Sequence, residues 1–236
     1  MNIAAIIQAR MSSKRFPGKV LCMVNNKPLL LYLVESLKHC HSLQLVTIAT
    51  SIEKSDDPIA DFSHHQGIEC FRGSLTDVAG RFKTLLAKHR WEAFVRVSAD
   101  SPLLDHRLIE RGIKLYRDGD SEIVTNVFPR TFPSGQSVEI IKSDTFRNAY
   151  ERMESDYDRE HVTSFFYQQK GGFKVLNFSS EADYSDVDLS VDTKEDFRVF
   201  SQMINSMKKP HWDYNVHEII KLYRNTNREI THEKKH

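Results

Sequence analysis

The stretch IAAIIQARMSSKRFPGKVL, residues 3–21, joins an apolar run to a loop rich in positive charge. Residues 3–8 have the length and composition of a buried β-strand. The loop after them contains four cations, Arg10, Lys14, Arg15 and Lys19. Open α/β sheets place their ligands beyond the carboxyl ends of the strands. The stretch therefore predicts an α/β fold with an anion site directly after its first strand.

The residue types of this loop suit a polyphosphate. Cations neutralise its charge, hydroxyls donate hydrogen bonds, and a glycine lets the backbone approach closely. The residues that fill these roles are Arg10, Arg15 and Lys19, then Ser12 and Ser13, and finally Gly18. Two other phosphate loops are excluded, because neither GxxxxGK followed by Ser or Thr nor GxGxxG occurs in the sequence. A solvated surface run is the alternative, and we favour the anion site because the whole chain is nearly neutral.

Apolar runs of strand length alternate with helical patterns through the first half of the chain. This alternation is typical of βαβ units and a mostly parallel sheet. The predicted strands are residues 3–8, 43–50, 68–71, 93–98 and 122–125. We therefore predict an α/β three-layer sandwich with a mostly parallel central sheet.

Helices are predicted where apolar residues recur at i, i+3, i+4 and i+7. The predicted helices lie within residues 78–86, 108–116, 144–153, 158–168, 197–204 and 216–223. Ser74 and Asp77 are expected to open the first of them as a capping box. The polar tail, residues 225–236, is expected to fray.

After about Val127 the alternation is interrupted by Pro129, Pro133 and Gly135. A strand is expected to resume at residues 137–141, so this part of the chain is predicted to be an insertion that bears a hairpin. Two more strands are predicted, at residues 173–178 and 187–191.

Composition excludes several classes of protein. Among 236 residues, 40% are hydrophobic and 28% charged, and the formal net charge is +1. A general nucleic-acid binder or membrane-surface protein needs a strong basic excess, so we expect neither partner. The longest apolar stretch, residues 28–34, is too short to cross a bilayer. Because the first residues lack a basic segment and a cleavage site, we expect a cytoplasmic protein with reduced cysteines.

The stretch from Gln8 to Leu21 resembles the signature loop of the sugar cytidylyltransferases, in particular the branch named for spore coat polysaccharide biosynthesis protein F. The resemblance continues to about Val199. Lys27-Pro28-Leu29 resembles that family's GKP helix start, with Asn26 in place of the usual glycine. Residues 71–81 resemble the segment that helps to read the base, and residues 158–163 resemble its EREHVT stretch.

The length of 236 residues suits one domain, and the resemblance implies that this domain, over residues 1–236, is a nucleotidyltransferase. Its nucleotide half would span about 1–126, a sugar-binding and dimerisation insertion about 127–180, and C-terminal helices about 193–226. The implied reaction moves CMP from CTP to a sugar, a keto-sugar acid, and releases pyrophosphate for polysaccharide or glycoconjugate synthesis. The nucleotide-binding set is Gln8, Ala9, Arg10, Ser12, Ser13, Arg15, Lys19, Arg72, Ser74 and Arg81.

Two aspartates are the candidates for binding Mg²⁺. Asp100 follows the predicted strand 93–98, where a hard carboxylate can hold the ion on phosphate oxygens. The family has glycine where this chain has Ala99. Asp192 belongs to a stretch that resembles the family's VDTPEDF, with Lys194 in place of proline.

Each of these aspartates has a structural alternative. Asp100 would serve as a turn or helix-cap residue before Pro102. Asp192 would merely flank a helix that a capping box of Thr193 and Asp196 opens. Asp188, on the same strand face as Asp192, and the neighbouring Asp186 are further candidates.

The catalytic set is Arg10, Lys19 and Asp100. In this hypothesis the ion held by Asp100 and Asp192 aligns the α-phosphate with the anomeric hydroxyl of the sugar. Arg10 and Lys19 would offset the charge that grows on the leaving pyrophosphate.

An acidic acceptor needs cations and hydrogen-bond donors beyond the nucleotide half. The candidates are Arg130, Gln136, Glu139, Arg159 and His161. Each has a plainer interpretation as a surface or packing residue, and His161 lies inside a helical pattern. Residues 127–140 would alternatively form the interface of a homodimer.

Two other functions are consistent with a phosphate loop. A metal-dependent glycosyltransferase would use a preformed nucleotide sugar, but no DxD string stands at a strand end near the middle of the predicted sheet. A non-catalytic nucleotide-binding protein would bind CTP without product. The combination of Arg10, Lys19, Asp100 and Asp192 favours an enzyme.

Overall fold

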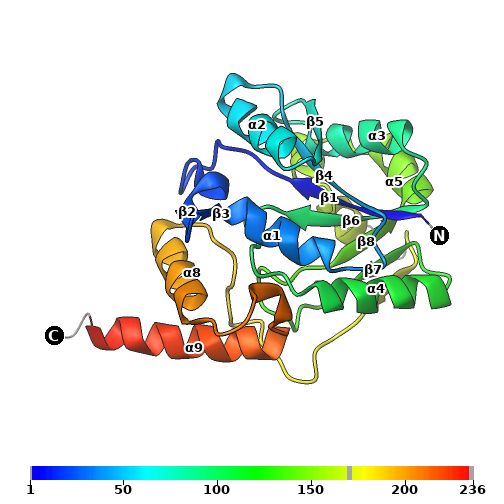
Figure 1. Cartoon of the computed structure of the whole chain (residues 1–236). Coiled ribbons are helices and arrows are strands. Elements are labelled where there is room, and N and C mark those ends of the chain that lie inside the picture. The colour runs from blue at the N-terminus through cyan, green and yellow to red at the C-terminus, as the bar shows by residue number, and fades with distance from the viewer. Residues whose placement is uncertain (1, 169–171, 234–236) are drawn as a thin grey trace.

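A seven-stranded sheet forms the middle layer of the structure, a computed structural model that describes residues 2–168 and 172–233 (Figure 1). The strand order is β5-β4-β1-β6-β8-β7-β9. The strands are β1 Ile3–Gln8, β4 Leu45–Ser51, β5 Glu69–Gly73, β6 Ala93–Ser98, β7 Ile123–Thr125, β8 Glu139–Lys142 and β9 Val175–Asn177. A separate two-stranded ribbon pairs β2 Met23–Val24 with β3 Lys27–Pro28. Only β8 runs antiparallel to its neighbours in the described sheet, so the prediction of a mostly parallel sheet is confirmed.

The connections reverse direction at β1. The chain leaves β1 for β4 and β5 on one side, and then crosses to β6 on the other side. Such a switch point opens a crevice beyond the carboxyl ends of the two strands, because the connections leave them in opposite directions. The crevice here lies beyond β1 and β6, where Gln8 is level with Ser98.

Helices cover both faces of the sheet. One face carries α1 Leu29–Lys38, α2 Asp57–His65, α4 His106–Asp118, α8 Lys194–Ser206 and α9 Val216–Glu233. The other face carries α3 Val78–Lys88, α5 Ser143–Tyr150 and α7 Ser164–Gln168. The remaining helical segments are α6 Asp156–His161 and the short η1 Lys19–Leu21, η2 Lys54–Asp56 and η3 His211–Asp213. The predicted three-layer sandwich is confirmed.

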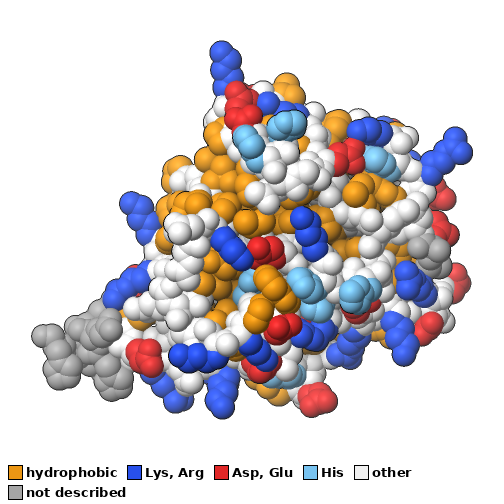
Figure 2. Space-filling model, viewed as in Figure 1, with side chains coloured by type: hydrophobic (Ala, Val, Ile, Leu, Met, Phe, Trp, Pro, Cys, Tyr) orange, Lys and Arg blue, Asp and Glu red, His pale blue; other side chains and the backbone are white. Residues whose placement is uncertain are grey.

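The first strand is buried on both sides, which explains its continuous apolar run. Ile3, Ala5 and Ile7 pack into the core beneath α1 and α4. Ala4 and Ile6 pack into the second core, beneath α3 and α5. Basic and acidic side chains are interspersed on the face seen in Figure 2, as expected from the small net charge. Within the described residues, no helix is both long and apolar enough for a membrane span.

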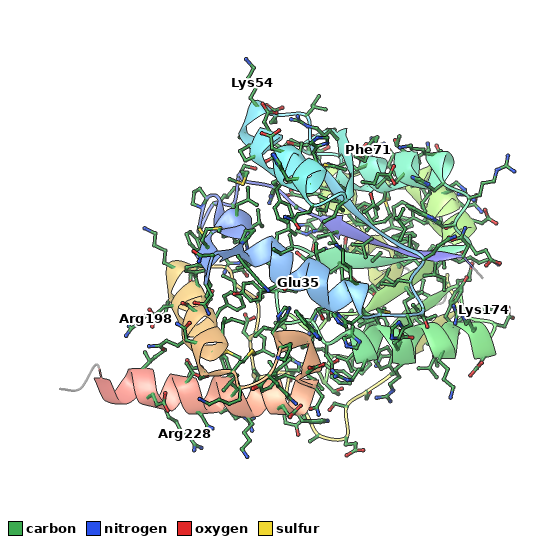
Figure 3. The ribbon with its side chains drawn as sticks, in the orientation of Figure 1. Glu35, Lys54, Phe71, Lys174, Arg198 and Arg228 are labelled. Atoms are coloured by element: carbon green, nitrogen blue, oxygen red, sulfur yellow. The ribbon has the colours of Figure 1, made fainter. Side chains whose placement is uncertain are left out.

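The structure corrects two local predictions, on the C-terminal tail and on the cap of α3, and confirms a third, the capping box before α8. The helix α9 extends to Glu233, so the prediction of fraying is wrong for residues 225–233; residues 234–236 lie outside the described residues. Ile230 is buried while Arg228 points outward, which gives the helix an apolar face to dock (Figure 3). Asp77, rather than Ser74, caps α3, because its carboxylate accepts the Gly80 N–H at 2.8 Å. The capping box of Thr193 and Asp196 is present.

Two segments also differ from the expected elements. Residues 187–191 do not form a strand of the sheet, because their backbone bonds to two different partners, Ser134 and Asp100. Residues 158–168 form two short helices instead of one, since Val162 adopts a φ of 55° between them. The hairpin-bearing insertion is confirmed, with β7 and β8 antiparallel on either side of residues 126–138.

Gly135 allows the insertion to approach residues 189–190. It has a φ of +80°, and a Cβ there would lie 2.7 Å from the Leu189 carbonyl carbon and 2.8 Å from the Ser190 nitrogen. We expect Gly135→Ala to lower the free energy of unfolding by about 3 kcal/mol, because it adds a backbone clash to the strain of a positive φ. Gly67→Ala is the matched control, since Gly67 has a φ of +62° and no atom near its Cβ position. It should lose only about 1 kcal/mol in urea unfolding, and equal losses would contradict the role of the close approach.

Candidate active site

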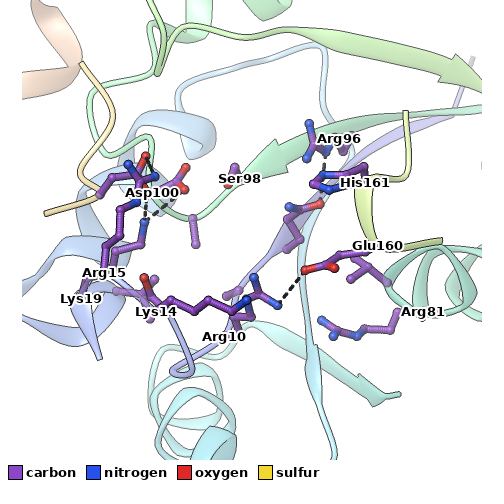
Figure 4. A pocket seen from close by; sticks show the side chains of 17 residues that line it. Arg10, Lys14, Arg15, Lys19, Arg81, Arg96, Ser98, Asp100, Glu160 and His161 are labelled. Atoms are coloured by element: carbon purple, nitrogen blue, oxygen red, sulfur yellow. Dashed lines mark hydrogen bonds and ion pairs between the residues drawn. The ribbon is translucent and has the colours of Figure 1, made fainter. Parts of the chain in front are cut away.

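A cavity of about 320 Å³ opens beyond the ends of β1 and β6 (Figure 4). Loop residues 9–19 form one wall, and α6 contributes Glu160 and His161 to the opposite wall. Alternate residues of one face of β6, continued past its end, line the floor: Arg96, Ser98 and Asp100. The cavity thus occupies the place that the switch point predicts for a ligand.

A buried aspartate anchors the loop. Asp56 is fully buried, and its Oδ1 accepts the Met11 N–H at 2.7 Å. Its Oδ2 accepts the hydroxyl of Thr50 and the N–H of Ser51, both at 3.2 Å. The Met11 carbonyl in turn accepts the N–H groups of Ser13 and Gly18 at 2.9 and 2.8 Å. This network folds the loop back on itself.

Gly18 then turns Lys19 inward. With a φ of 75°, Gly18 starts the short helix η1, and Lys19 is only 6% exposed. The Lys19 Nζ lies 2.7 Å from the Asp192 Oδ1 and 3.2 Å from the Asp100 Oδ2. The two aspartates therefore meet around one cation.

A backbone contact explains why Asp192 reaches Asp100. The Val191 N–H donates to the Asp100 carbonyl at 2.8 Å, so the next side chain along the chain lies beside the Asp100 carboxylate. On the outer side, the Arg15 Nη2 pairs with the Asp192 Oδ2 at 2.7 Å. Burial alone would raise the pKa of Asp192, but the hydrogen bonds and charges of Lys19 and Arg15 outweigh it and lower that pKa. Asp192 is thus a carboxylate at neutral pH.

The donor set fits a divalent ion such as Mg²⁺. Asp100 and Asp192 offer hard carboxylate oxygens, and the Lys19 ammonium between them shows that the pair holds positive charge. In the part of the chain that the structure describes, no group of three or more His, Cys, Asp and Glu side chains is placed to hold a metal. Two protein carboxylates with phosphate oxygens and waters are the usual arrangement for Mg²⁺.

The opposite side of the cavity contains further charged groups. The Arg10 Nη1 pairs with the Glu160 Oε1 at 3.3 Å across the cavity (Figure 4). Arg81 is almost fully buried and donates to the carbonyls of Ser74 and Leu75 at 2.6 and 2.8 Å. Its guanidinium therefore braces the start of α3 beside the cavity.

Most of the predicted nucleotide residues line this cavity. Those brought together are Gln8, Ala9, Arg10, Ser13, Arg15, Lys19 and Arg81, and the predicted metal ligands Asp100 and Asp192 line the same cavity. Ser12 is exposed and lies outside the lining. Arg72 also lies outside it, because its guanidinium bonds to the carbonyls of Ser51 and Glu53 and pairs with Asp57. The Ser74 hydroxyl accepts the Asp77 N–H, which is a structural contact.

Four of the five predicted acceptor residues lie outside the cavity lining. Gln136 is fully buried, where its amide oxygen accepts the Asp105 N–H and its amide nitrogen donates to the Leu103 carbonyl. Arg130 bonds the Pro133 carbonyl and the Ser137 hydroxyl away from the cavity lining.

Two further acceptor candidates also make structural contacts. The Arg159 Nε bonds the Met153 carbonyl, and Glu139 is buried beneath Arg96. Of the five predicted residues, His161 lines the cavity.

Sequence reasoning missed Arg96, Ser98, Glu160 and the anchor Asp56. Arg96 carried a signal, because a charge in the middle of an apolar strand is costly unless it is used. Glu160 stood next to His161 in the recognised stretch. Nothing local marks Asp56, whose role depends on a loop 45 residues away.

The profile of the cytidylyltransferase family matches residues 4–233. The chain belongs to the cytidylyltransferase family. It is therefore a nucleotidyltransferase, and the resemblance seen in the signature loop is confirmed.

Several relatives align over much of the cytidylyltransferase. An uncharacterized protein of Methanocaldococcus jannaschii is 31% identical over 206 residues, covering 86% of this chain and 83% of that protein. The spore coat polysaccharide biosynthesis protein SpsF of Bacillus subtilis is 27% identical over 230 residues, covering 94% and 93%. The 3-deoxy-manno-octulosonate cytidylyltransferase of Acaryochloris marina is 29% identical over 136 residues, covering 54% and 51%.

Solved structures share the fold. A cytidylyltransferase from Leptospira borgpetersenii superimposes with a TM-score of 0.90 at 27% identity, covering 96% of this chain and 95% of that one. A CMP:2-keto-3-deoxy-manno-octonic acid synthetase solved with CTP has a TM-score of 0.65 at 15% identity, covering 87% and 99%. Rv0371C of Mycobacterium tuberculosis, solved with manganese, has a TM-score of 0.61 at 14% identity, covering 88% and 100%. These last two show the fold alone.

The anchoring role of Asp56 can be tested against its neighbour. Asp56→Ala leaves buried donors of Met11, Thr50 and Ser51 without an acceptor, so it should lower the free energy of unfolding by about 3 kcal/mol. Asp57→Ala removes only an ion pair with Arg72 and should cost at most about 1 kcal/mol. Urea unfolding of both variants measures the difference. Equal losses would contradict an anchoring role.

The lowered pKa of Asp192 predicts an acid-dependent stability. At pH values above the pKa of an aspartate in the unfolded chain, about 3.9, the Asp192 carboxylate contributes its full share to the stability of the fold. This contribution is lost as the pH falls through the lower pKa that Asp192 has in the folded protein. The free energy of unfolding should therefore fall more steeply with acidification below about pH 4 in the wild type than in Asp192→Asn. Urea titrations at several pH values give both slopes. Parallel slopes would show that the ion cluster does not lower this pKa.

Proposed function

We propose that this cytidylyltransferase transfers CMP from CTP to the anomeric hydroxyl of a keto-sugar acid and releases pyrophosphate, for polysaccharide or glycoconjugate synthesis. The observation that carries the proposal is the cluster of Lys19 with Asp100 and Asp192, next to the cationic loop. The sugar-linked names of the relatives in Bacillus subtilis and Acaryochloris marina support the acceptor class.

The loop supplies the charge that a triphosphate requires. Lys14, Arg15 and Lys19 line one end of the cavity, and Arg10 lines its middle. The side chains of Arg10 and Glu160 are half-exposed, and an exposed ion pair contributes little free energy. A phosphate that enters the cavity can therefore replace Glu160 as the partner of the Arg10 guanidinium. Lys19 and Arg15 are held by Asp192 and are therefore positioned before the ligand arrives.

Asp100 and Asp192 would hold Mg²⁺, and the neighbour solved with manganese supports a divalent ion. When bound, the ion supplies positive charge to the phosphate oxygens and helps to align the α-phosphate. The residues of this chain bind the phosphates, orient them, and stabilise the charge on the departing pyrophosphate. Most of the rate enhancement would come from this positioning and charge stabilisation.

Pairing of two copies through residues 127–140 stays a prediction, and Phe128 in that segment is 55% exposed.

Pyrophosphate release tests the proposal directly. We expect release only with CTP, an acceptor and Mg²⁺ together, in a screen of four nucleotides against keto-sugar acids and neutral sugars. Lys19→Met and Asp100→Asn should each lower kcat by about 100- to 1000-fold, because the first removes a positive charge that stabilises the departing pyrophosphate and the second removes a carboxylate that would hold Mg²⁺. Lys83→Met is the control, since Lys83 lies on α3 outside the cavity lining and pairs with Glu151.

Three outcomes would contradict the proposal or a role assigned in it. Transfer from a preformed nucleotide sugar without pyrophosphate would indicate a glycosyltransferase. Calorimetric binding of CTP with no product from any sugar would indicate a non-catalytic nucleotide-binding protein. Full turnover in Lys19→Met would remove the assigned role of the ion cluster.

A further inference from the structure

One face of the sheet changes from apolar to polar at the same level on three adjacent strands. Phe94, Ile141 and Ile123 are in register across β6, β8 and β7, and all are buried in the core beneath α3 and α5. Two residues nearer the cavity, the register brings Arg96 opposite Glu139, and Glu139 opposite Thr125. The core therefore ends in a row of polar side chains directly beneath the cavity.

The row is a connected network. The Arg96 Nη1 donates to the Glu139 Oε2 at 2.7 Å, and its Nε donates to the Gln8 Oε1 at 3.1 Å. The Tyr167 hydroxyl donates to the Glu139 Oε1 at 2.8 Å and lies 3.1 Å from the Thr125 hydroxyl. Burial, followed by the charge of Glu139, raises the pKa of Tyr167, so the phenol keeps its proton and remains a donor. The Glu139 carboxylate is thereby held from both sides.

Such a network is a poor way to stabilise a sheet. The attraction within a buried ion pair offsets little more than the free energy lost when both charges leave water. Apolar residues of similar size stabilise the fold as well or better. The same face carries phenylalanine and isoleucine one step further from the cavity, so an apolar continuation was available. The polar row is therefore explained better by a ligand than by folding stability.

Arg96 has donors left for a ligand. Its Nη2 makes no hydrogen bond within residues 2–168 and 172–233, although Nε and Nη1 are both engaged. The side chain is 20% exposed and lines the cavity next to His161, on the side away from the ion cluster (Figure 4). Its orientation is fixed before any ligand binds, because Gln8 and Glu139 accept hydrogen bonds from two of its three nitrogen atoms.

The position matches an acceptor rather than the triphosphate. Arg96, Ser98 and Asp100 follow one face of β6, and alternate residues of a strand lie about 6.6 Å apart. The triphosphate is assigned to the end with Lys14, Arg15 and Lys19, which leaves Arg96, Ser98 and His161 around the remaining space. A guanidinium whose Nη2 has no partner among the described residues suits a carboxylate, which accepts charge-assisted hydrogen bonds from N–H groups.

We infer that Arg96 is the specificity-determining residue for the acceptor: it binds the carboxylate of the sugar acid, while Glu139 and Gln8 are positioning residues that hold its guanidinium. The inference rests on the proposed function and names the residue that selects acidic acceptors. It assigns Glu139 a role through Arg96 instead of direct contact with the sugar.

The test compares two acceptors in the full-length enzyme. One is a keto-sugar acid that supports pyrophosphate release, and the other is the same sugar with its carboxylate converted to an amide. Arg96→Gln should raise the KM for the acid by about 10- to 100-fold and abolish the preference for acid over amide. The KM for CTP should stay within about twofold of the wild type, because the phosphates bind elsewhere.

Conservative variants separate recognition from folding. Arg96→Lys keeps the charge but loses the fork, so it should retain part of the preference for the acid. Glu139→Gln loses the ion pair that holds the guanidinium and should lower the preference less than Arg96→Gln. Arg147→Gln is the matched control, since Arg147 donates to the Leu86 carbonyl and pairs with Asp144 on α5, outside the cavity. It should leave both KM values unchanged.

Several results would overturn the inference. An unchanged ratio of acid to amide in Arg96→Gln or Arg96→Lys would show that this residue does not read the carboxylate. A rise in the KM for CTP alone would place Arg96 at the nucleotide. Wild-type pyrophosphate release with neutral sugars only would overturn the role of Arg96 and leave CMP transfer standing. Absence of release with every sugar would remove the proposed function itself.

Discussion

The contact on which the rest of the structure depends is the Lys19 ammonium between the carboxylates of Asp100 and Asp192. Their sequence separations from Lys19 are 81 and 173 residues, yet all three groups meet at one end of the sheet. A buried lysine is costly unless it is paired, and two carboxylates repel each other unless a cation separates them. Opposite charges therefore hold three segments together: Lys19 of the loop, Asp100 at the end of β6 and Asp192 before α8.

The fold enforces this meeting through backbone contacts remote from the chemistry. The switch point at β1 brings the loop and the end of β6 side by side. The N–H of Val191 fixes the approach of Asp192 to Asp100, and Gly135 leaves room for the segment that carries it. The buried Asp56 carboxylate anchors the loop by accepting the Met11 N–H. Charged groups that must preorganise a site need such rigid supports, because displacements of about 1 Å weaken positioning strongly.

The second constraint is the polarity of the sheet face beneath α3 and α5. Its apolar half belongs to the core, and its polar half, with Arg96 and Glu139, forms the floor of the cavity. The same face of the sheet thus passes from packing in the core to lining the cavity within two residues along the strand. Sites built on strands hold their geometry better than sites built on loops, which suits recognition of a small acceptor.

The sequence by itself determined most of the local structure and marked the cationic loop. Apolar alternation predicted the parallel strands, and the density of cations between Arg10 and Lys19 predicted a binding site where the structure has a cavity, because both signals lie within a few neighbouring residues. Tertiary structure decided which polar residues face the cavity. Gln136 and Arg72 carry suitable groups but use them on backbone groups, whereas the Arg96 Nη2 has no hydrogen-bond partner in the part of the chain that the structure describes. The anchor Asp56 and the adjacency of Asp192 to Asp100 also depend on contacts between distant segments. Residue type states what a side chain can bind, but only the packing of the chain decides whether that capacity is already used.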